Sequence, residues 1–275
     1  MYYCLSTFFS LLDILAGVVK IDLRSCRDVL SAINIGLKEL RLMLQLERTI
    51  FCYILLFSIL GVYLSIFNQI YFDTVYTLED GVLEWLTVVA LLTTMVVCVK
   101  RLLWAGFSRG LPFFFVTFML TLFFLFGAGE EISWGQRLFN IESNEFFKTY
   151  NAQQETNLHN MTINGVKINQ PIFGTGLGLI LITYLAVLTP LYHKQPTIRR
   201  WLDNWAVPIP KGYHIIGYIV IIVMVEVVIK SLSDTGRRGE LTEFAGAFWV
   251  MLNILFPHNI NNFSNIISSK AADQS

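Results

Sequence analysis

Long apolar runs alternate with short polar loops along most of the chain. Six of these runs approach the roughly 20 residues that a helix needs to cross the hydrocarbon core of a bilayer. Because a spanning segment must satisfy its own backbone hydrogen bonds, we predict an all-α fold, a polytopic membrane bundle of about six transmembrane helices. The predicted spans are Ile50–Phe72, Gly81–Val99, Leu111–Gly129, Ile172–Tyr192, Gly212–Ile229 and Leu241–Phe256.

These spans predict three regions. Residues 1–48 form a cytoplasmic or interfacial N-terminal region, residues 49–257 form the transmembrane domain, and residues 258–275 form a cytoplasmic tail. Residues 130–170 form a long extracytoplasmic loop inside the second region. The last span is the weakest of the six, because it is short and carries Glu243 near its start.

The composition excludes a soluble enzyme. Of the 275 residues, 55% are hydrophobic and only 15% are charged, whereas a soluble domain carries about 25% charged residues. The 20 Lys and Arg residues are balanced by 20 Asp and Glu residues, so the chain lacks the basic surface that displaces counterions from nucleic acid. We expect the lipid bilayer, and no nucleic acid, as its partner.

The distribution of basic residues predicts the orientation. Fourteen of the 20 Lys and Arg residues lie in the N-terminal region, the second and fourth loops and the tail. Basic residues are retained on the cytoplasmic side of a membrane. Both termini are therefore predicted to be cytoplasmic.

Residues 27–48 differ from the spans, because their apolar residues recur at steps of three and four. This pattern predicts an amphipathic helix lying along the membrane surface, and a helix packed on a partner or on the bundle is the alternative. Residues 1–20 lack a basic start, and Asp13 interrupts them, so a cleaved signal peptide is not expected. If translation begins at Met43, residues 1–42 carry no function.

The first, third and fifth loops share one side of the membrane, since two spans separate each from the next. Twelve of the 20 acidic residues lie in or beside these loops, which predicts a strongly acidic face. Two segments at the starts of two spans are weakly similar in sequence: Leu78–Trp85, LEDGVLEW, and Arg237–Phe244, RRGELTEF. Each segment places a glutamate directly before an aromatic residue.

The third loop holds the richest set of polar residues. If the third span continues as a helix past Gly129, Glu130 shares a face with Trp134 and Arg137, and Glu131 lies on the neighbouring face. Further along, Glu155 and His159 are four residues apart and would face each other on a helix. A glutamate and a histidine at this spacing offer one oxygen and one nitrogen ligand to a metal.

We therefore predict a site for a divalent metal, zinc or manganese, in which Glu130 or Glu131 joins Glu155 and His159 as ligands. The metal would activate a water molecule, and a second glutamate would act as general base. Arg137 would hold an anionic group such as a lipid phosphate. This chemistry suits a hydrolase or transferase that acts on a lipid-linked or membrane-embedded substrate.

Two other interpretations remain open. In the first, Glu130 forms an ion pair with Arg137, and the polar residues only tie the loop to the bundle. In the second, an ion or proton pathway of a transporter uses the intramembrane residues Glu84, Glu226 and Glu243. A membrane assembly protein without catalytic activity would also fit the composition.

The string EEISWGQRLF at Glu130–Phe139, followed by ETNLHN at Glu155–Asn160, resembles a group of uncharacterised bacterial polytopic membrane proteins. The similarity extends more loosely to Glu79–Leu86 and covers about a third of the chain. This resemblance implies a bacterial inner-membrane protein and carries no reaction with it.

A second resemblance is to the membrane-embedded CAAX-prenyl-protease and bacteriocin-processing family, with its motifs EExxxR, FxxxH and HxxxN. Glu130 and Glu131 match the first motif, but Arg137 follows two residues too late, and Glu155 replaces the phenylalanine before His159. His258 and Asn262 match the third motif, yet the predicted topology places them on the opposite side from the glutamates.

Overall fold

The computed structural model describes residues 23–105, 107–163, 166–167 and 176–263. The predictions for residues 1–22, and those for the tail beyond residue 263, lie outside this range. The chain divides into two compact units, residues 1–49 and residues 50–275. The fold and the sites below belong to the second unit.

Helix α2, Leu23–Phe67, contains both the predicted surface helix and the first predicted span. Residues 27–48 are thus helical, as their pattern indicates, and they run without a break into the apolar segment. A position of these residues on the membrane surface stays a prediction.

Five helical stretches of the described residues are long and apolar enough to cross a membrane, which confirms the prediction of a multi-pass membrane protein at this coarser level. They are Arg41–Phe67, Val82–Ala105, Leu111–Glu131, Leu177–Lys194 and Gly212–Leu232. The sixth predicted span lies in helix α13, Arg238–Leu255, which is not among the five. It carries Arg238, Glu240 and Glu243 within 18 residues.

The remaining described elements are helical, apart from one short antiparallel pair of strands. After α2 come α3 (Gln69–Tyr71), the π-helical η1 (Phe72–Tyr76), α4 (Val82–Ala105), η2 (Phe107–Arg109) and α5 (Leu111–Glu131). The third loop holds η3 (Ser133–Gly135), α6 (Gln136–Phe139), α7 (Glu145–Tyr150) and the pair β1 (Thr162–Ile163) and β2 (Val166–Lys167). Then follow α8 (Leu177–Thr183), η5 (Tyr184–Leu188), α9 (Thr189–Lys194), α10 (Pro196–Asn204), α11 (Gly212–Ile222), η6 (Val223–Ile229), α12 (Lys230–Leu232), α13 and η7 (Ile260–Asn262).

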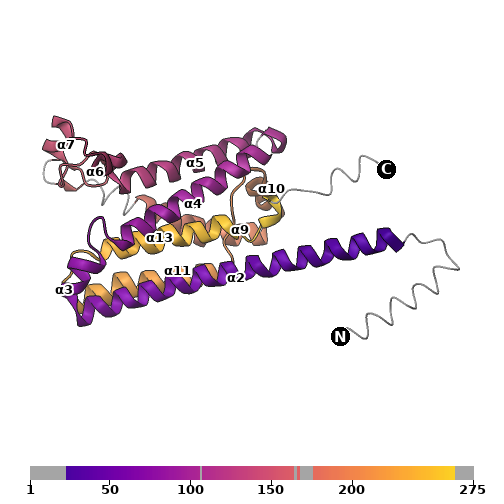
Figure 1. Cartoon of the computed structure of the whole chain (residues 1–275), viewed down its shortest axis with the longest axis horizontal. Coiled ribbons are helices and arrows are strands. Elements are labelled where there is room, and N and C mark those ends of the chain that lie inside the picture. Colours follow the sequence, from indigo (N-terminus) through magenta and orange to yellow (C-terminus); the bar gives the residue numbers. More distant parts are fainter. Residues whose placement is uncertain (1–22, 106, 164–165, 168–175, 264–275) are drawn as a thin grey trace. The chain divides into compact units, whose positions relative to one another are not determined.

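Helix α13 lies inside the bundle, between α4 and α11 (Figure 1). Its side chains Leu241, Phe244 and Leu252 belong to the main hydrophobic core, together with residues of α2, α4, α11 and η6. This position explains why its sequence is the least hydrophobic of the predicted spans. A helix shielded from lipid by its neighbours tolerates polar residues that a lipid-facing helix would not.

Two glycines allow the helices to approach closely. A Cβ atom on Gly61 of α2 would lie 2.6 Å from a methyl group of Leu241 in α13. A Cβ atom on Gly217 of α11 would lie 2.6 Å from the ring of Phe51 in α2. Small residues at helix contacts allow this backbone approach in membrane proteins.

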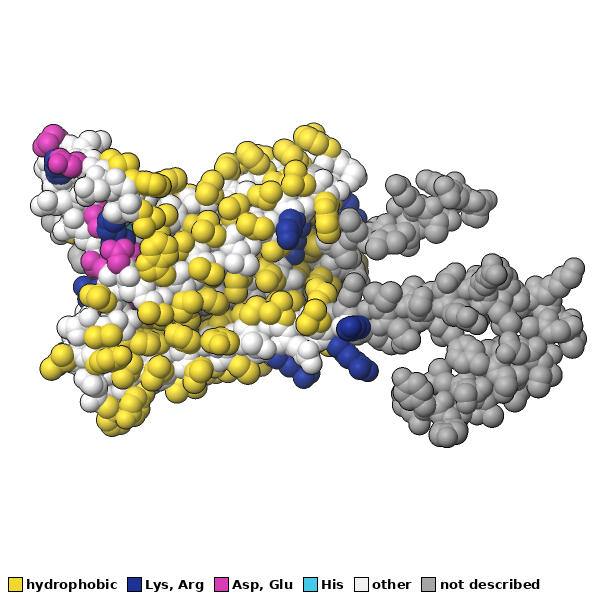
Figure 2. Space-filling model, viewed as in Figure 1, with side chains coloured by type: hydrophobic (Ala, Val, Ile, Leu, Met, Phe, Trp, Pro, Cys, Tyr) yellow, Lys and Arg dark blue, Asp and Glu magenta, His cyan; other side chains and the backbone are white. Residues whose placement is uncertain are grey.

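The first, third and fifth loops meet at one end of the bundle, as predicted. Thr235 of the fifth loop donates a hydrogen bond to Asp73 after α3, and Arg237 pairs with Glu79 at 3.5 Å. Figure 2 shows the acidic side chains of this face gathered at the end that carries α6 and α7, with hydrophobic side chains covering the middle. The acidic end predicted from the sequence is present.

We predict that Gly217→Ala destabilises the bundle by about 1–3 kcal/mol, because the added methyl group must displace the Phe51 ring. The measurement is the thermal unfolding midpoint of the detergent-purified protein. The control is Gly178→Ala in α8, where a Cβ atom meets nothing within 4 Å. Equal midpoints for the two variants would contradict the close packing of α11 on α2.

Candidate functional site

Helix α5 continues past Gly129 only to Glu131, so the single helical face of Glu130, Trp134 and Arg137 that a longer helix would give is not formed. Ser133, Trp134 and Gly135 all have positive φ angles, of 48°, 54° and 78°. This left-handed turn folds the Trp134 ring back over Gly129, where a Cβ atom would lie 2.9 Å from the indole. Glycine at position 129 leaves the room that the ring needs.

Glu130 is buried and accepts three hydrogen bonds. The indole N–H of Trp134 donates to Oε1 at 2.9 Å, and the backbone N–H groups of Leu158 and His159 donate to Oε2 at 2.5 Å and 3.1 Å. Oε2 of Glu130 therefore holds the distant part of the third loop against the end of α5, and Oε1 holds the nearby Trp134 ring. A carboxylate engaged in this way is a structural anchor for the loop.

The loop is closed by a wider set of polar contacts, which we call the loop network: Glu130, Ser133, Gln136, Glu155 and Asn157. Ser133 donates to Glu155 at 2.5 Å, and Asn157 Nδ2 donates to Ser133 Oγ at 2.9 Å. Gln136 Oε1 accepts the backbone N–H of Thr156 at 2.6 Å. These contacts join residues more than 19 positions apart in the chain.

The sequence predicted that Glu155 and His159 face each other on a helix, and this prediction is wrong. Residues 151–161 form turns and bends in place of a helix. Glu155 turns toward Ser133 and Arg137, whereas His159 Nε2 lies 3.1 Å from Asn160 Nδ2. The asparagines explain this departure. Asn151 accepts the backbone N–H groups of Gln153 and Glu155 and so fixes a turn in place of a helix.

Arg137 forms ion pairs with three acids of two different loops. Its guanidinium lies 3.0 Å from Asp80, 2.8 Å from Glu84 and 3.3 Å from Glu155. The alternative ion pair between Glu130 and Arg137 is not formed. Arg137 instead connects the start of α4 to the third loop.

Glu131 is the neighbour of Glu130 in sequence, but its side chain belongs to another group. Its carboxylate interacts electrostatically with those of Glu243, Glu84 and Glu240, and more weakly with that of Glu130. We call these four residues the acidic cluster: Glu84, Glu131, Glu240 and Glu243. They lie at the end of α5, at the start of α4 and in the first turns of α13.

Three members of the acidic cluster have no hydrogen bond or ion pair within the described part of the chain, although Glu240 interacts electrostatically with Arg237. Glu84 is paired with Arg137 and accepts the backbone N–H of Asp80 at 2.7 Å. The side chains of Glu131, Glu240 and Glu243, in contrast, form no hydrogen bond or ion pair with any described residue. Glu131 and Glu240 are partly buried, and Glu243 is exposed.

The structure thus divides the residues of the predicted metal site between two groups. Glu130, Glu155, His159 and Arg137 lie together in and around the loop network, and Glu131 lies in the acidic cluster. The described residues contain no group of three or more His, Cys, Asp or Glu side chains placed to hold a metal ion. Metal binding by Glu131, Glu155 and His159 stays a prediction.

The proposed ion pathway is also divided. Glu226, in the π-helical segment η6, pairs with Arg238 at 3.1 Å and accepts the hydroxyl of Thr242 at 2.8 Å. Glu84 is paired as well, which leaves Glu243 as the unpaired member of the three.

The sequence did not predict Glu240 as a neighbour of Glu131. The weak similarity between LEDGVLEW and RRGELTEF was the sequence feature that could have indicated this group, because it places Glu84 and Glu243 at corresponding positions near the starts of two helices.

Comparisons with known proteins add no family to this description: no family model, no curated protein and no solved structure matches the chain. The two resemblances drawn from the motifs therefore stay predictions. His258 follows α13, and the helical residues between Glu243, the neighbour of Glu131, and Leu255 at the end of that helix span about 18 Å.

We predict that Glu130→Ala releases the third loop, because two backbone N–H groups and one indole N–H lose their acceptor. The cost to the folded loop is about 2–3 kcal/mol, measured as faster hydrogen exchange and proteolysis of residues 140–163. Glu142→Ala, in the same loop but with an exposed side chain, is the control. Unchanged protection in Glu130→Ala would show that the carboxylate does not anchor the loop.

The pH dependence of the loop is expected to come from His159. Burial lowers the pKa of His159, and the nearby carboxylates of Glu130 and Glu155 offset this only in part. The folded loop therefore favours neutral histidine, so this stabilisation is complete above about pH 6.5 and is lost as the pH falls through the lowered pKa. Hydrogen exchange of residues 151–161 in wild type and His159→Gln checks this. The same pH dependence in both proteins would refute the assignment to His159.

Proposed function

We propose that the chain is a bacterial inner-membrane protein with six transmembrane helices and cytoplasmic termini, in which the acidic cluster takes up and releases protons or small cations during ion-coupled transport. The sixth helix of this proposal is α13. The observation that carries the proposal is the pair of carboxylates Glu131 and Glu243, which form no hydrogen bond or ion pair with any described residue and lie among other carboxylates.

The energetic argument begins with the cost of such a group. A carboxylate within a membrane bundle is expensive unless a cation or a proton compensates its charge. Neighbouring carboxylates add to this cost, because each disfavours the ionised form of the other. Glu131 interacts with four other carboxylates, and Arg137 is already shared among Asp80, Glu84 and Glu155. Arg237 interacts electrostatically with Glu240. Glu131 and Glu243 therefore remain the members of the cluster whose charge an exchangeable cation or proton would compensate.

The contrast with the loop network supports this interpretation. Glu130 and Glu155 lie at the same end of the bundle and are fully engaged by hydrogen bonds and ion pairs. Hydrogen bonds and ion pairs thus compensate the charge of other acids at this end of the bundle. Glu131 and Glu243 have no such partners among the described residues.

We predict that Glu243→Gln and Glu131→Gln each abolish proton or cation flux while the protein folds normally, because the amide cannot exchange a proton or bind a cation as a charge. The measurement is ion flux into proteoliposomes under a pH gradient or a membrane potential. Glu142→Gln, in the exposed part of the third loop, serves as the matched control. Flux that survives both cluster variants at the wild-type rate would rule out the acidic cluster as the pathway.

The second candidate is the metal-assisted hydrolase or transferase acting on a membrane-embedded or lipid-linked substrate. The same unpaired carboxylates favour it, since oxygen ligands from Glu131 and Glu243 suit a divalent metal, zinc or manganese. Arg137, next to the cluster, would orient an anionic group of the substrate.

Elemental analysis of the purified protein separates the candidates. Near-stoichiometric metal that is lost in Glu131→Gln but kept in His159→Ala would place a metal in the acidic cluster. Metal that is lost in His159→Ala would support the site predicted from the sequence, with Glu155 and His159 as ligands. Wild-type protein that contains no metal but still conducts protons or cations into proteoliposomes would favour the transport proposal.

A further inference from the structure

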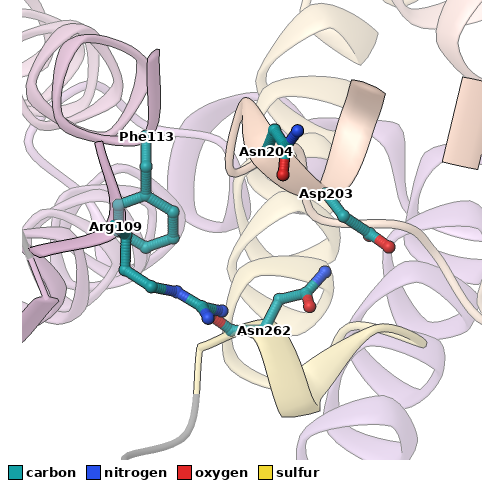
Figure 3. Close-up of a pocket in the computed structure, with 5 residues that line it drawn as sticks. All are labelled: Arg109, Phe113, Asp203, Asn204 and Asn262. Atoms are coloured by element: carbon teal, nitrogen blue, oxygen red, sulfur yellow. The ribbon is translucent and has the colours of Figure 1, made fainter. Parts of the chain in front are cut away.

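A second polar site lies at the other end of α5. A cavity of about 100 Å³ is lined by Arg109, Phe113, Asp203, Asn204 and Asn262 (Figure 3). Its walls come from the start of α5, the end of α10 and the turn η7. One water molecule needs only ~10–15 Å³ of such space, so the cavity has room for a larger polar group.

The cavity lies at the level of lipid headgroups. Arg109 comes two residues before α5, and the 21 residues of α5 rise about 32 Å to Glu131. This length matches the hydrocarbon core of a bilayer, about 30 Å thick. Trp104 at the end of α4 and Trp201 in α10 are 67% and 51% exposed near this end, as is typical of tryptophan at a membrane interface.

The two sides of the cavity offer opposite charges. The exposed Arg109 guanidinium donates to the backbone carbonyl of Asn262 at 2.5 Å and lies 5.7 Å from the centre of the Phe113 ring. Its fork holds five N–H donors, so donors remain for a ligand. On the other side, Asp203 accepts from Asn259 Nδ2 at 2.9 Å on one oxygen and from the Tyr192 hydroxyl at 3.5 Å on the other. Each carboxylate oxygen can accept more than one hydrogen bond, so acceptor capacity remains.

Between them lies a donor without an acceptor. The side-chain nitrogen of Asn262 is buried and forms no hydrogen bond with any described residue. Figure 3 shows this side chain rising from η7 toward Asn204 and Asp203. A buried donor without an acceptor is unfavourable, and a bound acceptor that fills the cavity removes this penalty.

We propose that this cavity binds a phospholipid headgroup that contains both a phosphate and a primary amine. Arg109 and Asn262 donate hydrogen bonds to the phosphate oxygens, and the ammonium group donates to Asp203. A simple anion would be repelled by Asp203, whereas a zwitterion satisfies both walls. This site is independent of the transport proposal, because it shares no residue with the acidic cluster.

The test is native mass spectrometry of the full-length, detergent-purified protein titrated with phosphatidylethanolamine, phosphatidylcholine and phosphatidylglycerol. We expect phosphatidylethanolamine to bind most tightly, because the quaternary amine of choline cannot donate a hydrogen bond and glycerol carries no positive charge. Asn262→Leu should weaken this binding about tenfold, since it removes one charge-assisted donor and keeps the backbone carbonyl that Arg109 binds.

Asp203→Asn provides the specificity test, because the amide oxygen still accepts from Asn259 while the negative charge is lost. This variant should bind phosphatidylethanolamine and phosphatidylglycerol equally. Arg200→Gln, at an exposed position of α10 outside the cavity, is the control and should bind as wild type.

Two results would overturn the proposal. Equal binding of the three lipids by wild type, together with unchanged binding by Asn262→Leu, would show that lipid contacts the protein only nonspecifically and that the cavity holds water. Displacement by soluble phosphoethanolamine at the same concentration as the lipid would identify a soluble ligand of the same chemistry and refute the lipid assignment.

Discussion

The enclosure of a polar helix by apolar ones determines the rest of this structure. Helix α13 carries Arg238, Glu240 and Glu243 in its first turns, and charged groups are costly in contact with lipid. The chain places this helix between α4 and α11, where Leu241, Phe244 and Leu252 join the main core. The close approach of α2 to α13 at Gly61 is part of this enclosure, and the loops that meet at this end lie beside the start of α13.

The acids at that end serve two different purposes, and adjacent residues illustrate the division. Successive side chains on a helix point about 100° apart, so Glu130 faces the third loop while Glu131 faces α4 and α13. Glu130 accepts hydrogen bonds from three N–H groups. Glu131, in contrast, interacts with other carboxylates and forms no hydrogen bond or ion pair with a described residue. The first residue stabilises the loop, and the second is the one to which we assign the exchangeable proton or cation.

Periodic and local features were predictable from the sequence, and features set by distant contacts were not. The apolar runs gave five membrane-compatible helices, and the counting of spans placed the first, third and fifth loops at one end. The turn at Ser133–Gly135 was missed because a helical pattern continues through it, and only the packing of Trp134 on Gly129 reveals the turn. The partners of Arg137 lie 53 and 57 residues earlier, in Glu84 and Asp80, so no spacing rule could identify them.

The central claim is that Glu131 and Glu243 share an exchangeable proton or cation, and infrared spectroscopy of the carboxyl groups tests it most directly. At neutral pH, wild type should show the carbonyl stretch of a protonated carboxyl group, or a carboxylate band that shifts when a divalent cation is added. Glu131→Gln and Glu243→Gln should each remove this signal. A wild-type spectrum with only ionised carboxylates, unchanged by any added cation, would contradict the account.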